Sequence, residues 1–250
     1  ILMIFAVIGL AFALINGLPI KMGPVNNDGK NALELSRSEE ATRAFWIQMK
    51  ANEQIAKGLR LKDMPDEWFK VPSDESMKNG IGVLVCNRLM DQQRFDEADM
   101  LMKRLLAQQN GIIGLYRNLM VCDQMYVEMI SENRKEILDE MRTRDQLRVM
   151  KAMKKYPAVL RTEYVYALLA EQKPKKAEKL MAQFRQCAKS YPYPSEIEGE
   201  RQLMALAAAK MTAQKEHTHG TQTGKLIEPV PAYQTPKAPS EQKDFITNSS

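Results

Sequence analysis

A continuous apolar run opens the chain and limits what its first part can become. Residues 1–15 contain only apolar side chains and one glycine, and residues 18–20 extend the run. A helix that crosses a bilayer needs about 20 such residues. No basic flank precedes the run and no small-residue cleavage site follows it, which argues against a signal peptide. The run predicts the end of a transmembrane helix over residues 1–20, truncated at its upstream end, in preference to a buried core helix.

The rest of the chain has the composition of a soluble globular protein. Hydrophobic residues make up 44% and charged residues 27% of the 250 residues, which fits one medium domain with additional segments. The net charge of +5 comes from 36 basic and 31 acidic side chains, a mixed surface without the concentrated basic face that phosphate binding needs. We therefore expect no nucleic-acid partner. A basic domain for nucleic acid or anionic lipid would rest on Lys151, Lys154 and Lys155, a cluster more typical of a solvated helix end.

The cysteines and histidines match no disulfide or metal pattern. Cys86, Cys122 and Cys187 are odd in number and far apart, so they favour a reducing compartment over a disulfide framework or a zinc knuckle. His217 and His219 are two residues apart, a spacing that suits neither an HExxH helix nor a closed zinc site. We expect no metal at these histidines.

Helical periodicity extends from residue 36 to residue 211, and no strand pattern competes with it. Ser36 with Glu39 forms a capping box that opens a helix to about residue 57, with Gly58 as its stop signal. Its predicted apolar face carries Ala41, Phe45, Gln48, Ala51 and Ile55. The segment 59–72 contains two prolines, Trp68 and Phe69, and is expected to be an ordered loop held by its aromatics. Further helices are predicted at about 75–92, 95–109, 112–131, 134–154, 158–171, 174–190 and 195–211.

Three of the turns between these helices resemble one another at a spacing of about forty residues. They are LMDQQRFDEA at 89–98, MISENRKEI at 129–137 and LLAEQKPKKA at 168–177. One helical hairpin cannot bury its apolar stripe alone, so about three hairpins stacked under a capping helix would form a continuous core. The first turn resembles the inner turn of a tetratricopeptide repeat. We expect an all-α domain over residues 36–211 with tetratricopeptide-like hairpins, and an irregular helical bundle is the alternative.

The composition changes again after residue 211. Residues 212–250 are rich in Thr, Gln, Lys, Pro and Ser and contain four prolines with few large apolar side chains. Such a segment cannot bury enough apolar surface to offset the entropy of ordering. We expect a disordered tail.

The residues that carry chemistry lie around the junction between the membrane segment and the helical domain, two of them in the motif loop over residues 21–35. Asn16, Pro19, Asp28 and Gly29 join the membrane segment to an acidic residue in a region rich in Gly, Pro and Asn. Charged side chains near a bilayer are commonly retained for ions, protons or metals. The alternative is that Asp28 and Gly29 belong to an ordinary turn.

The segment INGLPIKMGPVNNDGKNAL, residues 15–33, resembles the second signature of the site-2 protease family of intramembrane zinc metallopeptidases. That signature is Asn-x-x-Pro, a short loop and Asp-Gly, which Asn16, Pro19, Asp28 and Gly29 match. The loop is longer here, and Asn27 replaces the usual apolar residue before the Asp. The resemblance implies that Asp28 is a zinc ligand and that the other three residues support the motif.

The resemblance also implies two histidine ligands and a general-base Glu on an HExxH helix, which these 250 residues lack. We therefore expect the C-terminal part of a membrane-embedded zinc metallopeptidase with a protein or peptide substrate, whose HExxH helix lies upstream. The helical domain is expected in the cytoplasm, where it would bind a protein partner. A non-enzymatic membrane-tethered helical-repeat adaptor is the alternative.

Overall fold

The computed structural model describes residues 2–22, 25–37, 39–70, 78–108, 112 and 114–218. In this part the fold is all-α, as the periodicity predicted, apart from one two-residue strand pair. The helices are α1 (Leu2–Gly17), α2 (Asp28–Ser36), α3 (Glu39–Ala56), α4 (Lys78–Asp91), α5 (Phe95–Ala107), α6 (Gly114–Ile130), α7 (Lys135–Met141), α8 (Arg144–Ala152), α9 (Pro157–Val165), α10 (Pro174–Ala188) and α11 (Pro194–Thr218). The shorter elements are β1 (Lys21–Met22), which pairs antiparallel with β2 (Val25–Asn26), the 3-10 turns η1 (Leu61–Asp63) and η2 (Asp66–Phe69), and the π-helical turn η3 (Tyr166–Ala170).

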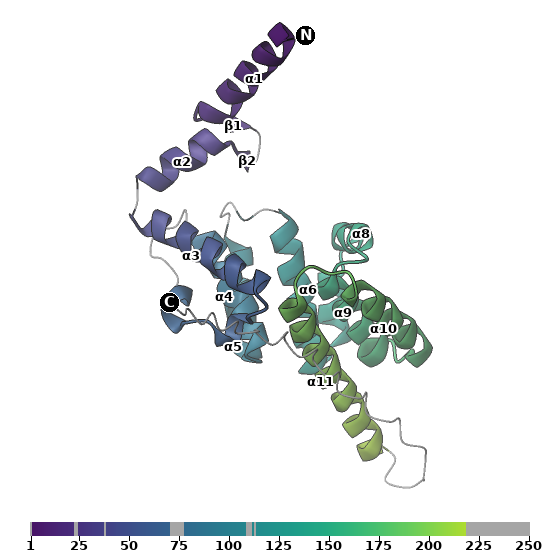
Figure 1. The fold of residues 1–250 in the computed structure, drawn as a ribbon. Helices are drawn as coiled ribbons and strands as arrows, with labels where there is room; N and C mark the ends of the chain where they lie inside the picture. Colours follow the sequence, from purple (N-terminus) through teal and green to yellow (C-terminus); the bar gives the residue numbers. More distant parts are fainter. Residues whose placement is uncertain are drawn as a thin grey trace, which may run out of the picture.

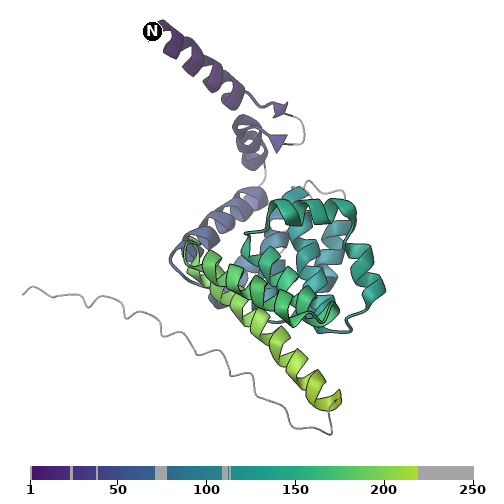
Figure 2. The same ribbon diagram turned by 90° about the vertical axis from the view of Figure 1, so that its right-hand side faces the viewer.

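The first two helices and the strand pair form a hairpin that stands apart from the remaining helices (Figures 1 and 2). All side chains from residue 2 to residue 20 are exposed. Over the described ranges, no helix has both the length and the apolar character needed to cross a membrane. Residues 28–35, which were predicted to belong to a loop, form α2. Ser36 is the last residue of α2 and does not open the next helix as predicted, because α3 starts at Glu39.

The body of the molecule is built from helical hairpins packed side by side. Helix α4 packs on α5, α6 on α7 and α9 on α10, while α5 contacts α6, α6 contacts α9 and α11 contacts α9. At the three turns, Gln93, Asn133 and Gln172 have positive φ angles of 60°, 55° and 53°. A left-handed residue after the last helical turn is a common way to end a helix. The turns that looked alike in sequence therefore share a backbone conformation, about forty residues apart.

The core is rich in methionine. One buried cluster runs from α4 to α11 and includes Met102, Met120, Met125, Met129 and Met204. Methionine is flexible and polarisable, so it fills irregular gaps between helices that cross at different angles. The methionines of this cluster thus serve mainly a packing role.

Helix α3 confirms the predicted helix, with Ala41 and Ala51 buried as predicted, but the rest of its buried face is rotated from the predicted one. Its buried residues are Ala41, Ala44, Ile47 and Ala51. Phe45, which was predicted to be buried, is 45% exposed. The prediction was wrong because both sets of positions recur at helical spacing, and the small alanines let α3 pack closely against α4.

The predicted ordered loop after α3 is present and is held by its aromatic residues. Phe69 is buried, and the guanidinium carbon of Arg88 lies 4.2 Å from its ring centroid. Trp68 packs edge-on against Trp46 of α3, with ring centroids 6.1 Å apart. Residues 71 and 72, at the end of this predicted loop, lie outside the described residues.

Two further boundaries differ from the sequence prediction. The helix expected over 134–154 is divided into α7 and α8, because Thr143 starts a new helix by accepting a hydrogen bond from the Gln146 amide at 3.1 Å. Helix α11 continues through Thr218, whereas the tail was predicted to start at residue 212. His217 falls within this helix, and residues 219–250, with His219, lie outside the described residues.

Candidate metal-ligand turn

The four residues of the predicted motif lie at the junction between α1 and α2. Asn16 is the next-to-last residue of α1, and Pro19 is exposed in the connection that follows. Asp28 and Gly29 are the first two residues of α2. The fold therefore brings the second half of the motif next to the end of the apolar helix.

Asn27 holds this junction together. Its side-chain amide donates hydrogen bonds to the carbonyl oxygens of Ile15 and Leu18, both at 2.5 Å. Its side-chain oxygen accepts hydrogen bonds from the backbone amides of Ile20 at 3.1 Å and Lys30 at 3.0 Å. The two bonds from the Asn27 amide satisfy carbonyl oxygens at the end of α1, and the bond from the Lys30 backbone amide caps the start of α2. One 8% exposed side chain thus caps both helices.

Gly29 allows the close approach of the two helices. A Cβ atom at this position would lie 2.2 Å from the carbonyl oxygen of Gly17 and 3.0 Å from that of Asn16. Real side chains do not come this close to backbone oxygen, so any larger residue would have to move α2. Glycine is therefore required at position 29 for packing, and this requirement explains why a glycine follows Asp28.

Asp28 is exposed at the first helical position of α2. Its carboxylate forms no hydrogen bond or ion pair with any described side chain. The helix N-terminus favours a negative charge at this position. The carboxylate is therefore free to bind a metal ion or another external group. Asn27 and Gly29, on either side of it, fix the position of the backbone.

The described residues supply one carboxylate at this turn and no complete metal site. No group of three or more His, Cys, Asp or Glu side chains in the described ranges is arranged to hold a metal ion. An exposed, unpartnered carboxylate on a fixed turn fits the role of a single zinc ligand. The remaining ligands would have to come from elsewhere.

The role of Asn27 was not predicted from the sequence, in which this residue is a departure from the family pattern, because an apolar residue is usual there. The available signal was that Asn is among the best helix N-cap residues and stands directly before Asp28 and Gly29. Its bonds to Ile15 and Leu18 could not be read from the sequence, because they require the chain to reverse.

We expect Gly29→Ala to separate α2 from α1 although alanine is the better helix former by about 1 kcal/mol. The new methyl group would overlap the Gly17 carbonyl, and overpacking of this kind costs about 1–3 kcal/mol. Amide hydrogen exchange over residues 28–36 should become severalfold faster. Gly17→Ala is the matched control, because a Cβ there meets no atom within 4 Å. Unchanged exchange in Gly29→Ala would contradict the close packing of the junction.

Comparison of the chain with protein-family models, with curated proteins and with solved structures finds no match.

Proposed function

We propose that this chain is the C-terminal part of a membrane-embedded zinc metallopeptidase similar to site-2 proteases, and that Asp28 is one of its zinc ligands. The observation that carries the proposal is the exposed Asp28 carboxylate on a turn that Asn27 and Gly29 fasten to the end of an apolar helix. A fixed backbone matters because a metal ligand must be held in position by its surroundings.

The proposal includes a membrane location for α1. Its side chains from Leu2 to Ile15 are apolar and exposed around the whole helix. A helix that is hydrophobic on all sides is stable in the apolar interior of a protein or a membrane, and none of its residues is buried against protein. We propose that it is the end of a transmembrane segment, which puts Asp28 near the membrane interface.

The remaining ligands are assigned to an HExxH helix that these 250 residues do not contain. Two histidines and Asp28 would hold the zinc, with one position open. When bound, zinc lowers the pKa of a coordinated water towards neutrality and supplies the nucleophile for peptide hydrolysis. Asn27 keeps Asp28 at the junction through its four hydrogen bonds.

The helical hairpins that follow would recruit or restrict substrates from the cytoplasmic side. Stacked hairpins present extended surfaces that are commonly used for binding. Cys86 and Cys122 are buried and unpaired, which suits a reducing compartment.

The first test is zinc binding to this chain alone. A single carboxylate without two histidines cannot hold the metal tightly. Equilibrium dialysis should therefore show weak zinc binding that Asp28→Asn does not change, and a peptidase assay of this chain should show no activity. The complete protein should bind one zinc tightly. Tight stoichiometric zinc on this chain would overturn the proposed ligand set, and a complete protein without zinc would favour the membrane-tethered adaptor.

A further inference from the structure

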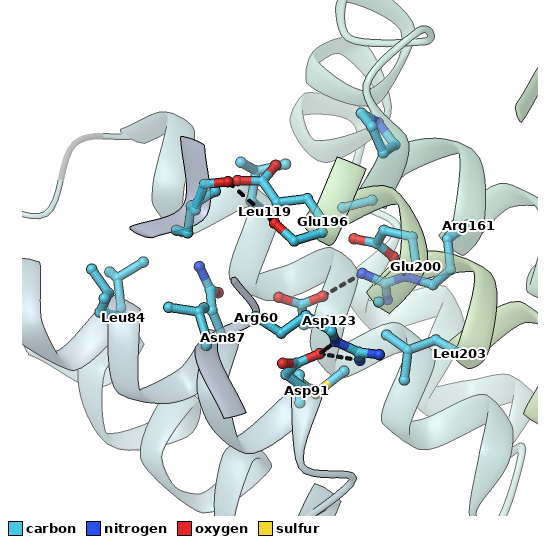
Figure 3. Close-up of a pocket in the computed structure, with 18 of the residues that line it drawn as sticks. Arg60, Leu84, Asn87, Asp91, Leu119, Asp123, Arg161, Glu196, Glu200 and Leu203 are labelled. Atoms are coloured by element: carbon cyan, nitrogen blue, oxygen red, sulfur yellow. Dashed lines mark hydrogen bonds and ion pairs between the residues drawn. The ribbon is translucent and has the colours of Figure 1, made fainter. Parts of the chain in front are cut away.

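The helical domain contains a cleft of about 530 Å³ on one face of the hairpin array (Figure 3). The first helix of each hairpin, α4, α6 and α9, contributes to its lining, and α3 and α11 lie at its sides. The second helices, α5, α7 and α10, contribute none of the lining residues. The cleft therefore follows the inner face of the array and crosses all three hairpins.

A buried arginine lies in its wall. Arg161 of α9 is 1% exposed. Its Nε donates to Glu200 of α11 at 2.8 Å, and its Nη2 donates to Asp123 of α6. Burial opposes the positive charge, but Glu200 and Asp123 outweigh it and raise the pKa of Arg161. Its Nη1 is buried and forms no hydrogen bond within the described structure.

The other charged groups of the cleft leave it acidic. Asp91 accepts hydrogen bonds from the Arg60 Nε and the Lys62 backbone amide, both at 3.0 Å, and Glu196 accepts one from the Tyr191 hydroxyl at 2.8 Å. Four carboxylates and two guanidinium groups therefore line the cleft, so two negative charges are uncompensated when all are ionised. Burial raises the pKa of Glu196 and of Glu200.

Uncharged groups line the rest of the cleft. Leu84 and Asn87 of α4 lie on the side away from Arg161 and Glu200, and Leu119 of α6 adds apolar surface near Glu196 (Figure 3). The Asn87 amide is exposed and bonds to no described residue. It can donate and accept at once, which suits a peptide backbone.

We propose that this cleft binds an extended peptide segment that carries a lysine or arginine side chain next to an apolar residue. The basic side chain would pair with Glu196 beside Glu200, and the apolar side chain would contact Leu84 and Leu119. Charge complementarity favours a cation over an acidic ligand, and the length of the cleft across three hairpins favours a peptide over a small cation. The inference does not rest on the assignment of Asp28.

The test is selection from a random decapeptide library by the full chain in detergent. Bound peptides should be enriched in Lys or Arg flanked by Leu, Ile or Phe. Replacement of the basic residue by Gln in a selected peptide should weaken binding by about tenfold or more, as should Glu196→Gln in the protein. Asn87→Ala, on the side away from Arg161 and Glu200, should weaken it by severalfold.

Glu198→Gln is the matched control. Glu198 is on the same helix but pairs with Arg201 on the exposed surface, so this variant should bind within twofold of the unchanged chain. Circular dichroism must show that all variants are folded. The proposal would be overturned if no peptides were enriched or if acidic peptides were enriched. It would also be overturned if Glu196→Gln and Glu198→Gln bound the peptide equally well, or if free arginine bound as tightly as the peptide.

Discussion

In a full-length protease of the proposed kind, with Asp28 as a zinc ligand, Asp28→Asn is expected to abolish cleavage of a membrane substrate. A neutral amide is a much poorer zinc ligand than a carboxylate, and loss of even a residue that only hydrogen-bonds to a metal ligand lowers metal affinity or activity by about 10–100-fold. We expect a loss above about 100-fold for Asp28→Asn and for Asp28→Ala, together with reduced zinc content. Both quantities should be measured on the same preparation.

The structure makes this experiment informative because it separates Asp28 from the fold. The Asp28 carboxylate is exposed and has no described partner, whereas Asn27 and Gly29 hold the junction. The Asp28 variants should therefore insert and fold normally. Glu39→Gln, an exposed acid at the start of α3, should retain full cleavage. Normal cleavage and zinc content in both Asp28 variants would reject the protease assignment and favour the membrane-tethered adaptor.

Arg161→Met should produce the largest loss of stability. Without the guanidinium, Asp123 and Glu200, whose side chains are only 13% and 17% exposed, remain as an uncompensated pair of carboxylates, and breaking a buried ion pair from one side costs about 3–5 kcal/mol. Chemical denaturation of the variant should show this loss. Arg201→Met removes an exposed pair with Glu198 and should change stability by less than about 1 kcal/mol.

The loss of stability in Arg161→Met should depend on pH in a defined direction. Burial raises the pKa of Asp123 and of Glu200, and Arg161 opposes this rise. In Arg161→Met the guanidinium that opposed this rise is absent, so the pKa of both carboxyl groups rises further in the folded state. The folded state then holds protons that the unfolded state releases near the ordinary carboxyl pKa of about 4. Stability then falls as pH rises from that value through the raised pKa. The difference between Arg161→Met and the unchanged chain should therefore be smaller at acidic pH than at pH 8.

A triple variant distinguishes charge burial from lost packing. Arg161→Met combined with Asp123→Asn and Glu200→Gln removes the whole charged group and should recover part of the stability. A deficit that is independent of pH, or a triple variant no more stable than Arg161→Met, would mean that packing against the Tyr126 ring, 4.9 Å from the guanidinium carbon, accounts for the effect instead.

Local sequence signals determined the helical class and the hairpin turns. The alternation of apolar residues at helical spacing does not depend on distant parts of the chain. The turns at Gln93, Asn133 and Gln172 were likewise visible as similar short segments, because a helix ends through contacts within a few residues. The same is true of the apolar composition of α1, whereas its exposure is seen only in the structure.

Contacts between residues far apart in the sequence determined the structure of the junction and the pairing of the buried charges. Asn27 acquires its role only when the chain reverses and brings it to carbonyls up to 12 residues earlier, and α2 follows from that cap. Arg161 reads in sequence as one more basic residue, yet it meets Asp123 and Glu200, which are 38 and 39 residues away. Periodicity states which helix faces are apolar, whereas the pairing of charges across helices depends on how the hairpins stack, and only the tertiary structure contains that information.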